Sequence, residues 1–139
     1  MARNGQRILV TGSTGQIGSE LTIELRRRFG GENVIATGHK KMPAGELLTS
    51  GPFEFLDLSR EEGISAMVRK KGIDVIYHLA AVLSVTGESD PITAWNVNMG
   101  SLVNVLEVAR KEKVDKVFWP STIGVFGPSS PRVNTPQET

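Results

Sequence analysis

The chain has 139 residues, 39% of them hydrophobic, and its 16 basic and 15 acidic residues leave a net charge of +1 at pH 7. This length suits one domain with a substantial core, and the balanced charge gives no reason to expect nucleic acid or a membrane surface as a partner. The absence of cysteine excludes disulfides and thiolate metal sites, and the two histidines are too far apart in the sequence to suggest a metal centre. The first residues are polar and no long apolar run is present, so we expect a cytoplasmic protein without a membrane span.

Strand and helix signals alternate along the chain. Short apolar runs predict five strands, at residues 8–10, 33–37, 53–56, 74–79 and 115–119. Apolar residues at helical spacing predict three helices, from Ile17 to Phe29, between Ser59 and Gly72, and over 91–113. Residues 38–52, 80–89 and 120–139 are predicted to be loops. This order predicts an α/β fold, a doubly wound Rossmann-type parallel sheet with strand order 3-2-1-4-5, in one domain over residues 1–139.

The helix ends carry specific signals. Ser59 with Glu62 three residues later is a capping-box pattern, and Asp90 followed by Pro91 is a typical helix start. Basic clusters at residues 26–28, 69–71 and 110–111 fall near predicted C-termini, where cations are favoured. The helix from Pro91 to Lys113 is predicted to bury an apolar face made of Ile92, Trp95, Met99, Leu102, Val103, Leu106 and Ala109.

A glycine-rich turn joins the first strand to the first helix. Residues 7–18 have the sequence R-I-L-V-T-G-S-T-G-Q-I-G. Such a turn presents backbone N–H groups and the positive end of a helix to a pyrophosphate. Gly12 would allow the tight turn, Gly15 a close approach of the ligand, and Gly18 close packing of the helix. The predicted phosphate-binding residues are therefore Gly12, Ser13, Thr14, Gly15, Gln16, Ile17 and Gly18.

The turn resembles the T-G-x-x-G-x-x-G phosphate loop of the extended short-chain dehydrogenase/reductase superfamily. Residues 80–88 (A-A-V-L-S-V-T-G-E), 119–128 (W-P-S-T-I-G-V-F-G-P) and 130–136 (S-P-R-V-N-T-P) also resemble the short-chain type of L-threonine 3-dehydrogenase. This resemblance implies an oxidoreductase that takes hydride from the threonine β-carbon onto a nicotinamide cofactor. Two alternatives stay open: a nucleotide-sugar epimerase or dehydratase, and a non-catalytic dinucleotide-binding module.

The resemblance also implies roles for residues at the strand ends. Asp57 and Leu58 would touch the adenine, although Asp57 could equally be a helix-entry residue. Leu79, Ala80 and Ala81 would lie near the nicotinamide ribose, with Asn98 bracing the fourth strand. His78, inside an apolar strand, is predicted to be a hydrogen-bonded core histidine.

Three hydroxyl residues are the candidates for substrate chemistry. By resemblance, Thr122 is the catalytic hydroxyl with Ser121 beside it, and Ser84 contacts substrate; a simple strand-end turn is the alternative for residues 121–122. The family's Tyr-x-x-x-Lys would follow beyond Thr139, and Tyr77, in the fourth strand, cannot replace it. The chain is therefore expected to be the cofactor-binding portion of a longer enzyme, or a truncated gene product, and to be inactive alone.

One departure concerns the cofactor. Family members usually place an acidic residue after the second strand, where it binds the adenosine ribose, but this chain has Gly38 followed by His39, Lys40 and Lys41. Loss of the carboxylate and gain of positive charge favour tolerance of a 2′-phosphate, so either NAD or NADP is expected; the alternative is that these lysines are solvated. The resemblance also implies a homodimer through the helix from Pro91 to Lys113.

Overall fold

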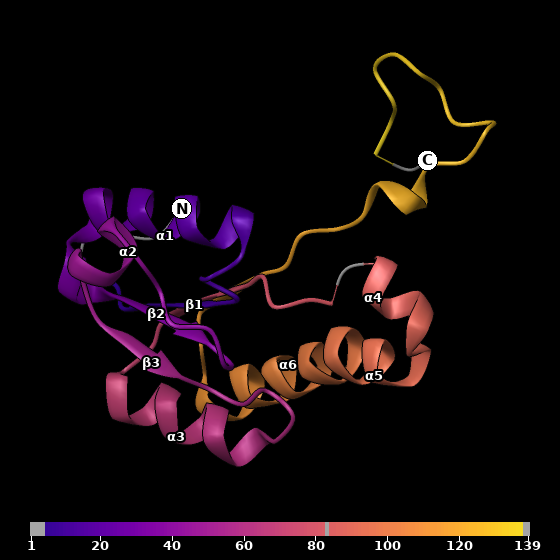
Figure 1. Cartoon of the computed structure of the whole chain (residues 1–139). Coiled ribbons are helices and arrows are strands. Elements are labelled where there is room, and N and C mark those ends of the chain that lie inside the picture. Colours follow the sequence, from indigo (N-terminus) through magenta and orange to yellow (C-terminus); the bar gives the residue numbers. More distant parts are fainter. Residues whose placement is uncertain (1–4, 83, 138–139) are drawn as a thin grey trace.

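Five parallel strands form one sheet in the order β3-β2-β1-β4-β5, which confirms the predicted fold (Figure 1). The computed structural model describes residues 5–82 and 84–137. In the central pair, Leu9 of β1 lies beside Ile35 of β2 and Ile76 of β4. The strands are β1 (Ile8–Thr11), β2 (Val34–Gly38), β3 (Phe53–Phe55), β4 (Val75–His78) and β5 (Lys116–Phe118).

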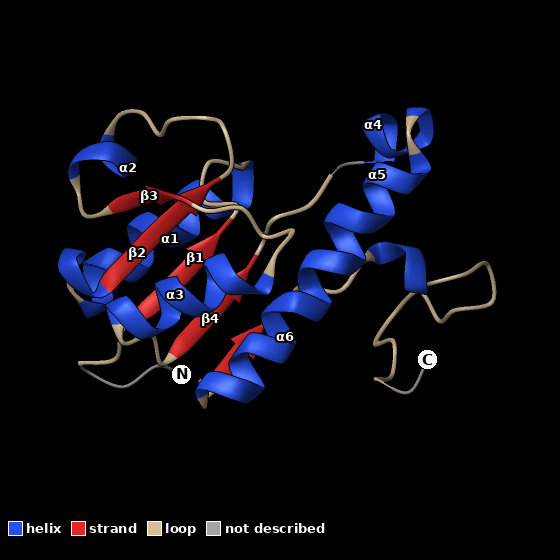
Figure 2. Cartoon of the chain, turned by 90° about the horizontal axis from the view of Figure 1, so that it is seen from below, coloured by secondary structure: helices blue, strands red, loops and turns tan. Residues whose placement is uncertain are grey.

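Helices cover both faces of the sheet, α1 on one side and α3 with α6 on the other (Figures 1 and 2). The helix α5, a π-helical turn at Asn96–Gly100 and α6 follow one another as a continuous rod (Figure 2). Single 3₁₀ turns lie at Gly31–Asn33 and Ile123–Val125. The helices are α1 (Gln16–Phe29), α2 (Glu46–Thr49), α3 (Glu61–Lys71), α4 (Ser84–Ser89), α5 (Pro91–Trp95) and α6 (Ser101–Glu112).

The core has two parts because successive strand residues point to opposite faces of the sheet. Ile8 and Val10 pack with Leu25 of α1, whereas Leu9 packs on the side of α3 and α6. Both faces of β1, β2 and β4 are covered, which explains why these strands are apolar runs rather than alternating patterns. The α3–α6 side also buries Ile35, Leu56, Ile64, Met67, Val68, Ile73, Ile76, Val105 and Val108.

Three local predictions need correction. The predicted loops at 38–52 and 80–89 each contain a short helix, α2 and α4, neither of which has an amphipathic repeat long enough to detect. The predicted capping box at Ser59 is wrong: the N-cap of α3 is Arg60, and the Ser59 N–H donates to Asp57 Oδ1 at 2.9 Å. The cap at Asp90 is confirmed, since its Oδ1 accepts the Thr93 N–H at 3.0 Å.

The buried face of the rod also differs from the prediction. Ile92, Trp95, Val103 and Leu106 are exposed, whereas the buried residues of α6 are Ser101, Leu102, Val105, Val108 and Ala109. The helix α5 lies beyond the carboxyl end of the strands, so it has no sheet to cover (Figure 1). The π-helical turn further shifts the phase between the two halves of the rod.

Arg26 differs from the other basic residues at helix ends. It is 3% exposed, and its guanidinium donates to the carbonyls of Val34, Leu47 and Pro52 and to Ser50 Oγ. Burial lowers its pKa, and Glu32 partly opposes that shift. Arg26 therefore links residues 47–52 to β2 by hydrogen bonds, in addition to any favourable interaction with the dipole of α1.

Candidate functional site

The turn between β1 and α1 requires glycine at two positions. Gly12 has φ +67°, and a Cβ there would lie 2.6 Å from the backbone nitrogen of Ala80. A Cβ on Gly18 would collide with the carbonyl oxygen of Gly12. Gly15 is less constrained, since its Cβ would lie 3.3 Å from that same oxygen. Gly12 thus makes the turn and touches the end of β4, and Gly18 brings α1 against the turn, as predicted.

Ser13 holds this turn to the second strand. Its N–H and its hydroxyl both donate to the carbonyl oxygen of Thr37, each at 3.0 Å. The Thr37 hydroxyl in turn donates to the carbonyl of Val10 at 3.0 Å. Because the Ser13 side chain is fully buried, its contribution is to fix the turn.

The N-terminus of α1 is open to an anion. Gly15 is the N-cap, with no side-chain cap, and the first turn holds no acidic residue. The first N–H groups of a helix have no intrahelical partner and carry the positive end of its dipole. Gln16 and Ile17 expose their side chains, with Ile17 68% exposed, so their contribution to a site would come from the backbone.

A cavity of about 580 Å³ opens at the carboxyl ends of the strands, next to this turn. Ten of the sixteen predicted cofactor residues line it, and six lie outside the lining: Ser13, Gln16, Ile17 and Gly18 of the turn, together with Lys40 and Asn98. Seven further lining residues were not predicted, and most of them lie one or two residues from a predicted position. They are Thr37, Leu56, Ser59, Val82, Asn96, Val97 and Ser101. The predicted residues among its lining are Gly12, Thr14, Gly15, Gly38, His39, Asp57, Leu58, Leu79, Ala80 and Ala81.

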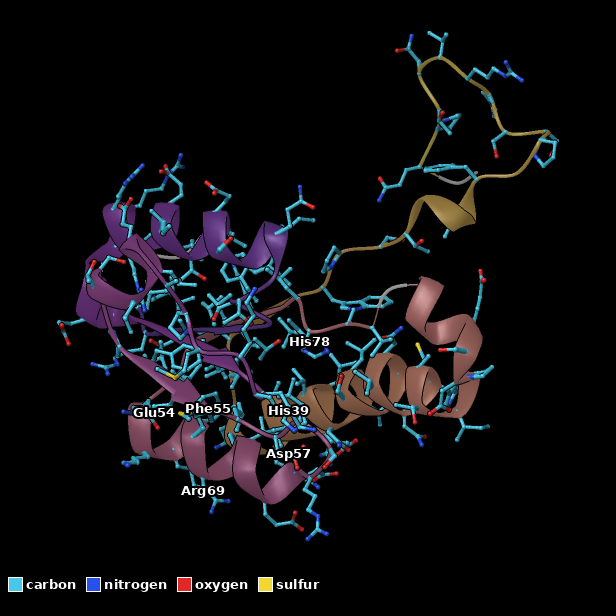
Figure 3. The ribbon with its side chains drawn as sticks, viewed as in Figure 1. His39, Glu54, Phe55, Asp57, Arg69 and His78 are labelled. Atoms are coloured by element: carbon cyan, nitrogen blue, oxygen red, sulfur yellow. The ribbon has the colours of Figure 1, made fainter. Side chains whose placement is uncertain are left out.

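Gly38, His39 and Asp57 form one rim of the cavity, at the ends of β2 and β3. A Cβ on Gly38 would lie 3.2 Å from both the Lys41 carbonyl oxygen and a Phe53 ring carbon, because the chain turns back over Gly38. Figure 3 shows His39 and Asp57 near one another at this rim. Hydrogen bonds from Ser59 lower the pKa of Asp57, and His39 adds a smaller electrostatic effect in the same direction.

The opposite wall follows β4. Asn98 clamps this segment by accepting the Val82 N–H at 2.7 Å and donating to the Val82 carbonyl at 3.1 Å. Its bracing role therefore acts just beyond β4. His78 is fully buried between Thr11 and Ser101, which confirms the hydrogen-bonded core histidine, and burial lowers its pKa to about 4.

The candidate catalytic residues do not line the cavity. Ser121 and Thr122 are exposed, and Thr122 Oγ1 accepts the Gly124 N–H at 3.2 Å. Ser84 begins α4, and its side chain lies outside the described part of the structure. Tyr77 stacks on Phe118 at 4.7 Å between ring centroids, and burial raises its pKa.

The described residues contain no helix long and apolar enough to cross a membrane. Within the same residues, no group of three or more potential histidine or carboxylate metal ligands gathers.

A parallel sheet in the order 3-2-1-4-5, with a glycine turn and a cavity at its switch point, defines a Rossmann-like fold. The chain belongs to the NAD dependent epimerase/dehydratase family, which it matches over residues 8–139. It is 46% identical over 134 residues to an uncharacterized epimerase/dehydratase of Staphylococcus saprophyticus, covering 96% of this chain and 42% of that relative. The chain thus spans less than half the length of such relatives.

Solved structures give the same picture. The L-threonine dehydrogenase of Clostridium difficile superposes with a TM-score of 0.89 and 44% identity, over 99% of this chain and 43% of that one. The UDP-glucose 4-epimerase of Thermus thermophilus, in complex with NAD, superposes with a TM-score of 0.74 and 32% identity, over 84% of this chain and 38% of that one. This L-threonine dehydrogenase and this UDP-glucose 4-epimerase therefore share the fold of the chain over the matched residues.

Proposed function

We propose that residues 1–139 form the dinucleotide-binding domain of a longer oxidoreductase. The observation that carries this proposal is the joining of an uncapped helix N-terminus, a glycine turn and a 580 Å³ cavity at one sheet edge. Ligand cavities commonly have volumes of roughly 300–1,000 Å³. The turn residues 12–18 would hold the pyrophosphate, the Asp57 rim the adenosine, and the wall after β4 the nicotinamide riboside.

The test is calorimetric titration of NAD into the 139-residue chain and into Gly15→Asp. The added carboxylate would face the pyrophosphate at the start of α1, so binding should be abolished. Gly127→Asp is the matched control: it adds the same charge at a position where a Cβ meets nothing within 4 Å. Equal affinity of Gly15→Asp and Gly127→Asp would reject the site.

We further propose that the longer enzyme oxidises L-threonine. The identity of 44% to a threonine dehydrogenase against 32% to an epimerase supports threonine over a sugar nucleotide. The reaction transfers hydride from the threonine β-carbon to the nicotinamide and the hydroxyl proton to a base, the tyrosine that the family's Tyr-x-x-x-Lys would place beyond residue 139. The product is 2-amino-3-oxobutyrate. When bound, nicotinamide supplies the hydride acceptor; Thr122, with Ser121 beside it, would orient the hydroxyl, and Ser84 would contact the substrate.

The competing enzyme function is epimerisation or dehydration of a nucleotide sugar. The two can be separated by assaying a protein extended beyond residue 139, first with threonine and NAD and then with UDP-sugars. Threonine-dependent reduction of NAD is expected, and it should fall at least about tenfold in Thr122→Ala. Turnover of UDP-sugars alone would assign the epimerase function, and cofactor binding without turnover of either would assign a binding module.

We propose that this domain accepts NADP as well as NAD. Gly38 leaves the end of β2 without a carboxylate, and His39, at the cavity rim, is followed by Lys40 and Lys41, which are exposed. A carboxylate there would repel a 2′-phosphate, whereas charge-assisted hydrogen bonds from cations would attract it.

We also propose a homodimer that pairs the α5–α6 rod with its copy. Trp95, Val103 and Leu106 are 65%, 54% and 48% exposed on this rod, an apolar surface that a second copy would cover. Sedimentation at high concentration should show a dimer that Val103→Glu dissociates. Val133→Glu is the matched control, because Val133 is 77% exposed outside the rod; a monomeric wild type would remove the proposal.

A further inference from the structure

Three buried polar side chains form a hydrogen-bonded chain beneath the cavity. Thr11 Oγ1 lies 2.9 Å from His78 Nδ1, and Ser101 Oγ lies 3.2 Å from His78 Nε2. Thr11 and His78 are 0% exposed and Ser101 is 3% exposed. Figure 3 shows His78 where the sheet approaches the rod. The chain of hydrogen bonds therefore connects β1 and β4 to the first turn of α6.

The direction of each hydrogen bond follows from the donors available. The Ser101 hydroxyl donates to the Val97 carbonyl, so its oxygen can only accept from His78, and Nε2 must carry the imidazole proton. In this neutral tautomer Nδ1 is an acceptor, so the Thr11 hydroxyl donates to it. The Thr11 oxygen in turn accepts the N–H groups of Leu79 at 3.2 Å and Ala80 at 3.4 Å. Every donor thus points the same way, from Ala80 towards Val97.

Both ends of this chain belong to the cavity wall. Leu79 and Ala80 line it from the strand side, and Val97 and Ser101 line it from the rod. The N–H groups of Leu79 and Ala80 are committed to Thr11, so they do not point into the cavity. Burial keeps His78 neutral at physiological pH, which preserves the arrangement that needs one donor nitrogen and one acceptor nitrogen.

We propose that His78 is a positioning residue that joins the two walls of the cavity, through Thr11 to the backbone after β4 and through Ser101 to the π-helical turn. It sets the spacing of these walls before any ligand arrives. Preorganisation of this kind lowers the free-energy cost of binding. The consequence for cofactor binding rests on the proposed function, whereas the tautomer and the wall geometry do not.

The first test is long-range ¹H–¹⁵N NMR of the 139-residue chain near neutral pH. His78 should show one tautomer, with a protonated Nε2 and an unprotonated Nδ1. His39, whose side chain is exposed at the rim, is the internal reference and should exchange between its two tautomers. A protonated Nδ1 at His78, or averaging of its two tautomers, would overturn the proposal.

The second test uses Thr11→Val, which keeps the side-chain shape but removes both the donor to His78 and the acceptor for Ala80. Amide exchange at Ala80 should quicken at least about tenfold, and NAD affinity should fall about fivefold, as expected for loss of one buried hydrogen bond. Thr22→Val is the matched control, because the hydroxyl of buried Thr22 donates only to the Gly18 carbonyl within α1; its Ala80 exchange should change less than about twofold. Equal exchange in the two variants would reject the positioning role. Failure of the wild type to bind NAD would instead reject the proposed function, while exchange and tautomer would still decide the role of His78.

Discussion

The glycine turn at 12–18 and the segment at 119–137 both follow a strand at the carboxyl edge of the sheet, yet they differ in every contact. In the turn, Gly12 touches the backbone of Ala80 and Ser13 is bonded to Thr37. In the later segment the described side chains are exposed, apart from the half-buried Ser130, and its hydrogen bonds are local (Figure 1). A strand end fixes where a segment starts, but only packing against neighbours fixes its conformation.

The largest effect should come from removing the glycine that makes the turn. Gly12→Ala places a methyl group at φ +67° and 2.6 Å from the Ala80 nitrogen, so the backbone itself must move. We expect a loss of at least about 3 kcal/mol in the free energy of unfolding, measured by urea denaturation.

Gly127→Ala is the control for this change, since its Cβ would meet nothing within 4 Å and its φ is not positive. Its stability should stay within about 0.5 kcal/mol of wild type. Comparable losses in the two variants would show that the segment at 119–137 is as constrained as the turn.

This contrast also explains what sequence analysis could predict. The sheet order and the turn could be predicted because an apolar run, glycines and a helix are adjacent along residues 8–29. The burial of Arg26 could not be predicted, because its partners Leu47, Ser50 and Pro52 are 21 to 26 residues away in the sequence. Nothing in the sequence separates this arginine from Arg27, which is exposed and pairs with Glu46.

The same distinction separates the cavity residues that could be predicted from those that could not. Asp57 and Ala80 could be predicted from their position after a strand. Ser101 and Val97 could not, because the π-helical turn that brings them to the wall leaves no mark in the helical spacing. Their signal was the pattern of His78, a polar residue in an apolar strand, which requires hydrogen-bond partners from another element.

The second prediction concerns the free energy of unfolding at acid pH, which depends on the buried His78. Burial holds the pKa of His78 at about 4, below its usual 6.5. Above pH 6.5 both the folded and unfolded states are neutral at this residue. As the pH falls from 6.5 to 4, only the unfolded state gains the proton, so stability should fall by about 3 kcal/mol and this contribution should level off below pH 4.

The measurement is the free energy of unfolding against pH for wild type and two variants. His78→Gln should lose this dependence between pH 6.5 and 4, and His39→Gln should keep it, because His39 is exposed. A wild-type curve that is flat in this interval would contradict a buried neutral His78.

The third prediction concerns the chain after β2, where the residues at 38–41 combine a packed glycine with exposed lysines. NADP should bind to the wild type within about tenfold of NAD at low salt, a difference of about 1.4 kcal/mol. High salt should weaken NADP more than NAD, since exposed charges are screened.

Replacing Lys40 and Lys41 together by alanine should weaken NADP several-fold and leave NAD unchanged. Lys113→Ala is the control, because Lys113 is an exposed lysine at the C-terminal end of α6, whereas the N-terminal end of α6 lines the cavity. If NAD binds to the wild type more than about tenfold more tightly than NADP at low salt, the lysines are solvated and do not recognise the 2′-phosphate.

The smallest effect should come from shortening the exposed segment. Ending the chain after Phe126 removes residues whose described side chains are exposed or, at Ser130, half-buried, and the hydrogen bonds that these side chains make are local to the segment. The free energy of unfolding should change by less than about 0.5 kcal/mol. Ending the chain after Asp115 instead removes β5, whose Val117 packs on the core and whose pairing with β4 is lost, so several kcal/mol should disappear. A large loss from the first truncation would mean that the segment packs on the domain in solution, and the two regions would then differ in degree only.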